Sequence, residues 1–242
     1  MESNQFKTLD LNIDDNHHKE FKENRVHDIL YDSLDEDNKH NQRILYSRLY
    51  PKENLITENR NISILTEHLI LTSAANVVPD IIQKLGVTCV ISAAPELPAI
   101  PLKTNITYHR IDVMDSPNSH IGSFLDEAAD LINKVSSTGG CCLVFCVAGV
   151  SRSATLCIAY LMKYHQLTLK EAYDYVKMRR PRIKPNCGFF KQLIEYEKDM
   201  FINGSVQMVF NEFVQMCIPD VYDNEYQVIR RINSKFKNRC RQ

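Results

Sequence analysis

The sequence predicts an α/β sandwich, a fold in which a sheet and helices pack as layers around one core. Two observations predict this class. Short apolar segments rich in Val and Ile alternate along the chain with longer segments whose apolar residues recur at helical spacing. In addition, the apolar run 141–145 leads through a short loop into the long apolar segment 151–164, as a buried strand leads into a helix in such folds.

Length and composition predict one domain with an extension at each end. The chain has 242 residues, of which 44% are hydrophobic, enough for a sizeable core. Residues 1–59 are polar, and their 13 Asp and Glu exceed their 8 Lys and Arg, so we predict an acidic, mostly disordered extension there. The folded domain is expected at 60–203. A further extension at 204–242 ends in a basic tail, 230–242, without acidic residues.

The predicted strands are short segments rich in β-branched and aliphatic residues. Four of them precede the central strand: 62–65, 69–71, 87–91 and 106–113. A helix is expected between the second and the third of these, over 79–85. Pro79 suits a first helical turn, and Gly86 suits the position after a helix.

Three further helices are predicted from their capping residues and apolar spacing. Ser123 is expected to cap a helix whose apolar face repeats over 124–135. Thr168 and Glu171 form the sequence signature of a capping box at the start of the next helix. Asn186 is expected to cap the last helix, which carries a run of large apolar residues.

The segment between the central strand and its helix has the composition of a phosphate-binding loop. Loop N–H groups and the positive end of a helix dipole converge at such a junction, where they stabilise a bound dianion or a thiolate. We therefore predict Cys146 as a thiolate nucleophile, Arg152 as a forked donor to phosphate oxygens and Ser153 as a hydroxyl that eases departure of the sulfur. Gly149 allows the loop to turn tightly. The predicted loop comprises Val147, Ala148, Gly149, Val150, Ser151 and Arg152.

The competing interpretation of this segment is an ordinary strand-to-helix crossing with an inert core cysteine. Of the eight cysteines, only Cys146 is followed by Arg six residues later. That spacing, together with Gly149 and the Ser-Arg-Ser start of the helix, favours the phosphate loop. The cysteines show no C-x-x-C spacing, and neither a metal site nor a cofactor is predicted.

Two runs of sequence carry a resemblance to a known family. The chain resembles the small atypical dual-specificity phosphatases, of the cysteine-dependent protein tyrosine phosphatase superfamily, in V-A-G-V-S-R-S-A-T-L-C-I-A-Y-L-M-K-Y-H at 147–165 and in R-R-P-R-I-K-P-N-C-G-F-F-K-Q-L-I-E-Y-E at 179–197. The resemblance covers about residues 60–200, and 206–225 resembles a tail that some members carry. It implies a three-layer sandwich: a central, mostly parallel sheet of about five strands, helices on both faces, and the phosphate loop at the C-terminal end of the central strand.

The resemblance also implies an activity. It is that of a protein phosphatase that hydrolyses phosphotyrosine and phosphoserine or phosphothreonine through a phosphocysteine intermediate. The general acid is predicted to be Asp115, in the polar loop V-M-D-S-P-N-S-H-I, which is similar to the acid loop of the family. A plain turn is the competing interpretation for Asp115, because Asp before Ser-Pro often opens turns. Asp112 is the second candidate for the acid.

Phe145 departs from the resembled family, which normally has His immediately before the nucleophile. That His hydrogen-bonds the loop backbone and Phe cannot, so we expect a slower enzyme with no catalytic group missing. Two alternatives stay open: a phosphate-binding pseudophosphatase that docks phosphoproteins with weak activity, and a sulfur transferase. Asn186 is predicted to support the phosphate loop as well as to cap its helix.

Partners and location are predicted from charge and composition. The expected partner is a phosphorylated protein, with the oligomeric state left open, and the net charge of -1 gives no case for nucleic acid. Neither a long apolar run nor a signal peptide occurs, so an intracellular protein, cytoplasmic or nuclear, is expected. Membrane contact through the basic tail is less favoured than a solvated tail. A second basic run is expected to be solvated or to line the mouth of the site: Arg179, Arg180, Arg182 and Lys184.

Overall fold

A computed structural model describes residues 61–102, 105–223 and 226–227. These residues belong to one compact unit, 50–242. The predicted extension 1–59 and the basic tail 230–242 lie outside the described residues.

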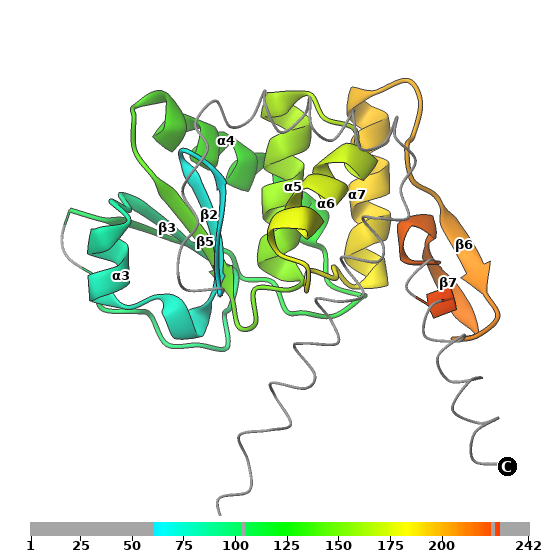
Figure 1. The fold of residues 1–242 in the computed structure, drawn as a ribbon, viewed down its shortest axis with the longest axis horizontal. Helices are drawn as coiled ribbons and strands as arrows, with labels where there is room; N and C mark the ends of the chain where they lie inside the picture. The colour runs from blue at the N-terminus through cyan, green and yellow to red at the C-terminus, as the bar shows by residue number, and fades with distance from the viewer. Residues whose placement is uncertain (1–60, 103–104, 224–225, 228–242) are drawn as a thin grey trace, which may run out of the picture. The chain divides into compact units, whose positions relative to one another are not determined.

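The fold is built on a five-stranded sheet with the strand order β1-β2-β5-β3-β4 (Figure 1). Its strands are β1 (Ile62–Thr66), β2 (Leu69–Ser73), β3 (Cys89–Ser92), β4 (Thr107–Arg110) and β5 (Cys142–Cys146). Only β1 runs antiparallel to its neighbour, and the other pairs are parallel. The predicted mostly parallel sheet is therefore confirmed. β5 lies in the centre and is buried at every position, as a strand covered on both faces must be.

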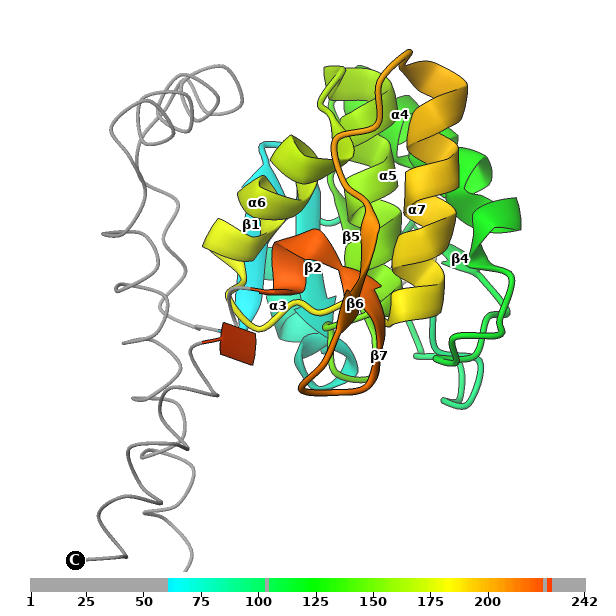
Figure 2. The ribbon, with the colours of Figure 1, turned by 90° about the vertical axis from the view of Figure 1, so that its right-hand side faces the viewer.

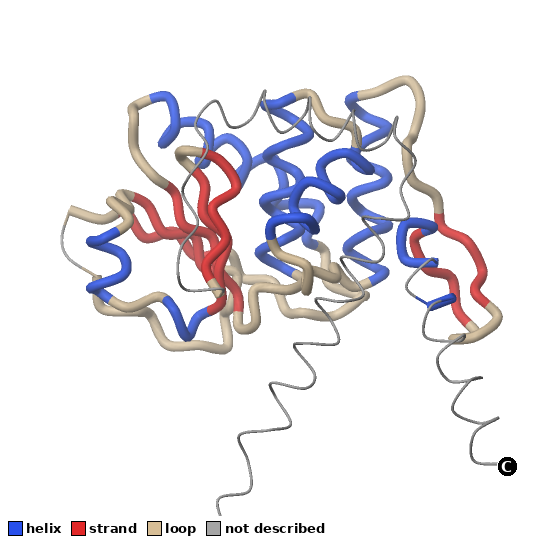
Figure 3. Tube along the Cα trace, viewed as in Figure 1, coloured by secondary structure: helices blue, strands red, loops and turns tan. Residues whose placement is uncertain are grey.

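Helices cover both faces of this sheet (Figures 1 and 3), as predicted. The α-helices of the described residues are α3 (Pro79–Lys84), α4 (Leu125–Ser137), α5 (Arg152–His165), α6 (Leu169–Arg179) and α7 (Cys187–Met200). α3 packs on one face. α4 and α5 pack on the other face, and α6 and α7 pack against α5. α5 is buried from Arg152 to Met162, which explains why it is apolar on all sides.

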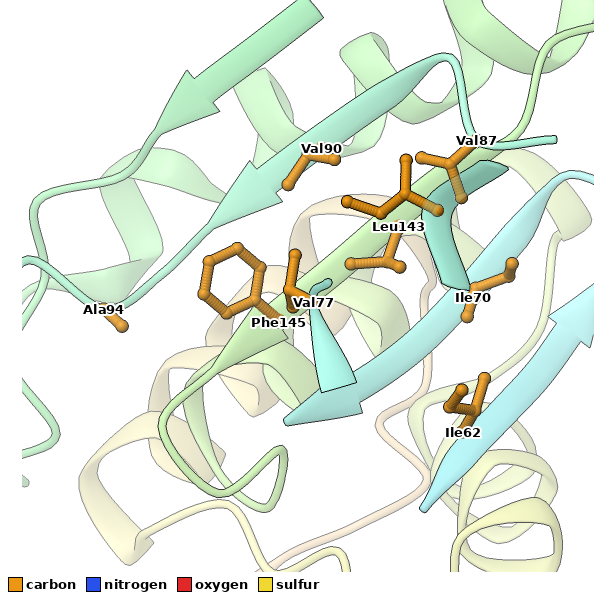
Figure 4. Packing of buried hydrophobic residues seen from close by; sticks show 9 residues of the cluster. Ile62, Ile70, Val77, Val87, Val90, Ala94, Leu143 and Phe145 are labelled. Carbon is orange, nitrogen blue, oxygen red and sulfur yellow. The ribbon is translucent and has the colours of Figure 1, made fainter. Parts of the chain in front are cut away.

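The core on the α3 side includes the residue before the predicted nucleophile. In Figure 4, Phe145 and Leu143 of β5 point to the same side as Val90 of β3. They belong to an apolar cluster made of Ile62, Ile70, Val77, Ile82, Val87, Val90, Ala94, Leu143 and Phe145. At about 25 cal/mol per Å² of apolar surface, burying such a cluster is the main stabilising contribution on this face.

Two of the three predicted helix caps are present in the structure, and one is not. Thr168 forms the capping box with Glu171, and the Asn186 side chain accepts a hydrogen bond from the Phe189 N–H. The expectation for Ser123 is wrong, because Ser123 lies inside a 3-10 turn, η2 (Ile121–Phe124), and its hydroxyl donates back to the His120 carbonyl. α4 consequently begins after η2, without a side-chain cap.

β4 is shorter than the predicted strand 106–113. The Ile111 N–H still donates to the Ser92 carbonyl at 2.8 Å, but the chain then turns on itself, with the Val113 N–H donating to the Ile111 carbonyl. The pairing with β3 ends there, and the chain continues as the loop that carries Asp115.

After α7 the chain forms a hairpin that packs beside that helix (Figure 2). Its strands, β6 (Met208–Asn211) and β7 (Met216–Pro219), are followed by a 3-10 turn, η3 (Asp220–Tyr222). The Tyr222 ring packs on Phe190 at 5.2 Å between centroids, and its hydroxyl donates to the Pro185 carbonyl at 2.7 Å. Buried Glu197 adds a second anchor, since it accepts the N–H groups of Leu169 and Ser205 at 2.7 and 2.8 Å.

Candidate active site

The segment 147–151 forms a tight loop between the end of β5 and the start of α5. Gly149 adopts φ 66°, a left-handed conformation that a residue with a Cβ atom rarely takes. A Cβ at Gly149 would also lie 2.5 Å from the Thr72 carbonyl oxygen. The prediction that Gly is needed for this turn agrees with both observations. The loop opens at the C-terminal edge of the parallel strands, where α/β folds place ligands.

Cys146 and Ser153 are in direct contact at the base of the loop. The Ser153 hydroxyl donates to the Cys146 sulfur at 3.1 Å, and both residues are buried. A hydroxyl that donates to sulfur stabilises a thiolate more than a thiol, because hydrogen bonds to charged acceptors are the stronger ones. Ser153 therefore lies where it can assist the sulfur as attacking group and as leaving group.

Arg152 is the first residue of α5 and is almost completely buried, with 3% of its surface exposed. Its two Nη atoms donate to the two carboxylate oxygens of Glu96 at 2.7 and 2.6 Å, a bidentate ion pair. Its Nη1 also donates to the Val113 carbonyl at 3.3 Å. Burial works to lower the pKa of Arg152, but its hydrogen bonds to Glu96 and the nearby charges of Cys146 and Asp115 outweigh it and raise that pKa.

Glu96 is a site residue that the sequence did not reveal. It follows β3 in the segment A-A-P-E, at the same edge of the sheet as the loop after β5. The hydrogen bond from Arg152 lowers the pKa of Glu96, so the ion pair persists at mildly acidic pH. The only available sequence signal was its place directly after a buried strand.

The structure brings Asp115, and not Asp112, to the phosphate loop. One carboxylate oxygen of Asp115 accepts hydrogen bonds from the Ser151 hydroxyl at 2.8 Å and from the Asn186 side-chain amide at 2.9 Å. Its other oxygen lies 3.8 Å from Nε of Arg152. Asp112 instead pairs with Arg110 at 2.7 Å and is largely exposed.

Asn186 has three contacts, one that caps its helix and two that reach the loops of the site. Its side-chain oxygen accepts the Phe189 N–H at 3.0 Å and so caps α7. Its side-chain nitrogen donates to Asp115, and its backbone N–H donates to the Ser151 hydroxyl at 3.2 Å. The start of α7 thus joins the loop that carries Asp115 to the loop that follows Cys146.

The structure places the four basic residues of the run 179–184 in different surroundings. The Arg179 guanidinium stacks over the Tyr175 ring at 4.0 Å, and the Lys184 ammonium lies 4.5 Å from the centre of the Tyr226 ring. Arg180 is buried behind the loop, whereas Arg182 is exposed and donates to the Ala148 carbonyl at 3.2 Å. Only Arg182 fits the expectation of a basic residue at the mouth of the site.

Neither a metal cluster nor a membrane span is found in the described part of the chain. None of its groups of His, Cys, Asp and Glu is arranged to hold a metal ion. None of its helices is long and apolar enough to cross a bilayer.

Gly188 fixes the distance between α7 and the loop that carries Asp115. A Cβ at Gly188 would lie only 1.9 Å from the Pro117 carbonyl oxygen, so an added methyl group must push the two segments apart. We expect Gly188→Ala to lower kcat by about tenfold or more through displacement of Asp115, since a misplacement near 1 Å can cost ~100-fold. The measurement is kcat on an aryl phosphate of high leaving-group pKa. Gly204→Ala is the matched control, because the nearest atom to its Cβ is 3.7 Å away; equal kcat values for the two variants would contradict the prediction.

Comparison with known proteins identifies similar sequences over most of the described chain. A family model described as the dual specificity phosphatase catalytic domain matches residues 69–199. Human dual specificity protein phosphatase 14 is 46% identical over 145 residues, which cover 60% of this chain and 72% of that protein. Human dual specificity protein phosphatase 18 is 45% identical over 143 residues, covering 59% of this chain and 74% of that protein.

Solved structures agree with the sequence comparison. The crystal structure of human DUSP28 superposes with a TM-score of 0.55 at 31% identity, over 58% of this chain and 95% of that one. The crystal structure of DUSP15 gives a TM-score of 0.54 at 34% identity, over 56% of this chain and 86% of that one. Because the family model matches more than half of its length, this chain belongs to the dual specificity phosphatase family.

Proposed function

We propose that this chain hydrolyses phosphate monoesters on tyrosine and on serine or threonine side chains of proteins, with Cys146 as its nucleophile. One observation carries the assignment of residues. The Ser151 hydroxyl, inside the loop after Cys146, donates to Asp115 at 2.8 Å. This contact holds a carboxyl group beside a loop that carries a buried Cys–Ser pair and a buried arginine. Nucleophile, anion site and proton donor are thereby assembled in one place.

In the first step the Cys146 sulfur attacks phosphorus, and the bond from phosphorus to the substrate oxygen breaks. The loop N–H groups and the Arg152 guanidinium hold the remaining phosphate oxygens, on which negative charge accumulates. Asp115 in its protonated form gives its proton to the departing oxygen, so that a neutral alcohol or phenol leaves.

In the second step water attacks phosphorus, and the bond between sulfur and phosphorus breaks. The Asp115 carboxylate takes the proton of this water, and inorganic phosphate is released. The Ser153 hydroxyl, 3.1 Å from the sulfur, stabilises the thiolate as it leaves. The enzyme returns to its starting protonation state at the end of the cycle.

The test compares two reactions. We expect inorganic phosphate release from phosphotyrosine and phosphothreonine peptides, and no thiocyanate from thiosulfate and cyanide. A covalent phosphocysteine at Cys146, trapped by rapid acid quench, would identify the intermediate. Thiocyanate production without phosphate release would contradict the phosphatase assignment and favour a sulfur transferase. Tight phosphopeptide binding without turnover would support the alternative assignment as a pseudophosphatase, which the family relationship does not favour.

Asp115→Asn tests the assignment of the general acid. We expect kcat to fall by about 100-fold or more for substrates whose leaving group has a high pKa, because such oxygens need a proton to depart. For leaving groups of low pKa the fall should be small. The measurement is kcat across a series of aryl phosphates, with Asp112→Asn as the matched control. A uniform loss across the series, or an equal loss in the control, would remove Asp115 from this role.

Phe145→His tests whether the missing family His can be restored. The Phe145 side chain lies in an apolar cluster, so an imidazole there leaves polar groups without partners. We expect the free energy of unfolding to fall by about 1–3 kcal/mol, the usual cost of a buried unsatisfied polar group. Urea unfolding measures this change, with Phe145→Leu as an apolar control. An equally stable His variant that alkylates Cys146 faster at mildly acidic pH would show that His reaches the loop.

Domain limits and location extend the same proposal. We place the catalytic domain at 60–203 and the C-terminal extension at 204–242. All cysteines in the described residues are free thiols, as proteins of reducing compartments have. This supports an intracellular protein, cytoplasmic or nuclear, that acts on phosphorylated proteins.

A further inference from the structure

Arg180 is a buried cation that the mechanism above does not use. It follows α6 directly, and only 2% of its surface is exposed. Its Nε donates to the Gly149 carbonyl at 2.6 Å, and its Nη2 donates to the Ala148 carbonyl at 3.2 Å. Its Nη1 donates to the Asn61 carbonyl at 2.9 Å and to the Ser63 hydroxyl at 3.4 Å. The guanidinium therefore joins the phosphate loop to the start of β1.

The charge of Arg180 has no acidic partner among the described residues. Burial lowers the pKa of Arg180 to about 10, and repulsion from Arg182 is the next largest cause of this shift. The side chain is therefore still charged at neutral pH. Arg152, by contrast, is neutralised by its bidentate pair with Glu96. A buried cation paired only with carbonyl and hydroxyl oxygens is costly for the folded state. Such a cost is expected where a functional geometry is being held.

The two loop carbonyls that Arg180 binds fix the orientation of two peptide planes. In a trans peptide the C=O and the following N–H point in opposite directions, and the described chain contains no cis peptide. When the carbonyls of Ala148 and Gly149 point to Arg180, the N–H groups of Gly149 and Val150 point away from it. Close contact leaves little freedom here, since a Cβ at Gly149 would lie 2.6 Å from Nη2 of Arg180.

We propose that Arg180 is a positioning residue of the phosphate loop. It binds the carbonyls of Ala148 and Gly149, which point away from the phosphate. The N–H groups of Gly149 and Val150, on the opposite sides of the same peptide planes, are thereby directed at the bound phosphate. Arg180 supports the loop backbone in a chain in which Phe145 offers no hydrogen bond to it. The proposal rests on the proposed function, because it assumes that the loop after Cys146 binds the phosphate group.

Arg180→Lys is the decisive variant, because it keeps a positive charge but loses the planar fork that binds two carbonyls. The probe is inorganic phosphate, whose Kd is measured by calorimetry in the wild-type background and again in the Cys146→Ser background. We expect the Kd to rise by about tenfold or more and kcat to fall by about 10- to 100-fold, as for the loss of aligned backbone donors.

Tyr175→Phe is the matched control. Tyr175 also joins α6 to β1, through a hydrogen bond from its hydroxyl to the Leu65 carbonyl, but this contact does not involve the phosphate loop. We expect a lower melting temperature and an unchanged phosphate Kd for this variant. Arg180→Lys should change the Kd even when the two variants have equal melting temperatures.

A folded Arg180→Lys protein with wild-type phosphate affinity would overturn the proposal and leave Arg180 a purely structural residue. Should this variant fail to fold, hydrogen exchange in the wild type decides. Phosphate must then slow amide exchange at Gly149 and Val150, and unchanged exchange at both would equally overturn the proposal. Failure of the proposed function looks different: the wild type itself would neither bind phosphate nor release it from phosphopeptides.

Discussion

Cys146→Ser is expected to reduce hydrolysis of an aryl phosphate by about 10⁴-fold or more while leaving the protein folded. Loss of a covalent nucleophile has effects of this order in other enzymes. The serine hydroxyl stays protonated at neutral pH and is a far weaker nucleophile than a thiolate. The Ser153 hydroxyl, which donates to the sulfur at 3.1 Å, cannot remove that proton. The measurement is steady-state release of inorganic phosphate.

Two controls separate loss of the nucleophile from loss of structure. Cys217→Ser changes a thiol that is exposed in β7 and should keep full activity. The phosphate Kd of Cys146→Ser should not exceed about twice the wild-type value, because the anion is bound by backbone N–H groups and Arg152, and loss of the thiolate charge favours a bound anion. More than a few per cent residual activity in Cys146→Ser would exclude Cys146 as the nucleophile.

The parts of the site that lie together in the sequence were the predictable ones. Cys146, Gly149, Arg152 and Ser153 belong to one strand-loop-helix segment, so their spacing alone carries the geometry of the loop. Asp115 required a further step, from its position in a polar loop after a strand and from the similarity of that loop to the acid loop of the resembled family. Its contacts with Ser151 and Asn186 follow from tertiary packing, which no local pattern encodes.

Glu96 and Arg180 show why the remainder was not predictable. Both lie outside the loop segment, and each reaches the loop through a contact between distant parts of the chain. A carboxylate in A-A-P-E and one arginine in R-R-P-R have many ordinary surface interpretations. Glu96 reaches Arg152 because the strand order places the ends of β3 and β5 side by side. Arg180 is buried because the end of α6 lies against the start of β1 and the loop after β5.

The fold itself was predictable at the level of layers and less so at the ends of elements. Hydrophobic periodicity gave the helices and the buried strands, and confirmed caps at Thr168 and Asn186 set two helix starts. Ser123 failed as a cap because a 3-10 turn precedes α4, and a hydroxyl can equally bond backward within such a turn. The hairpin of β6 and β7 was not predicted from periodicity, since its strands are short and half-exposed.

Arg152→Lys is expected to lower kcat/KM by about 1,000-fold, which is the scale reported for arginines that stabilise a transferring phosphoryl group. The wild-type side chain is 3% exposed, and both of its Nη atoms are held by the Glu96 carboxylate. Its Nε lies 3.8 Å from Asp115 and makes no hydrogen bond within the described residues, so at least one of the five N–H donors is available to phosphate. A planar fork can bind carboxylate and phosphate together, whereas an ammonium group is a single point of charge.

Glu96→Gln separates the orientation of Arg152 from its charge. Glutamine removes one negative charge next to the anion site, so inorganic phosphate should bind at least as tightly as in the wild type. The bidentate pair that holds the guanidinium is lost, so kcat should fall by about tenfold. Arg152→Lys should weaken phosphate binding and kcat together, because Lys replaces the donors themselves. Phosphate Kd by calorimetry and kcat on an aryl phosphate are measured for each variant.

Two outcomes would contradict these predictions. An unchanged phosphate Kd in Arg152→Lys would mean that Arg152 does not line the anion site. An unchanged kcat in Glu96→Gln would mean that Arg152 needs no support from Glu96.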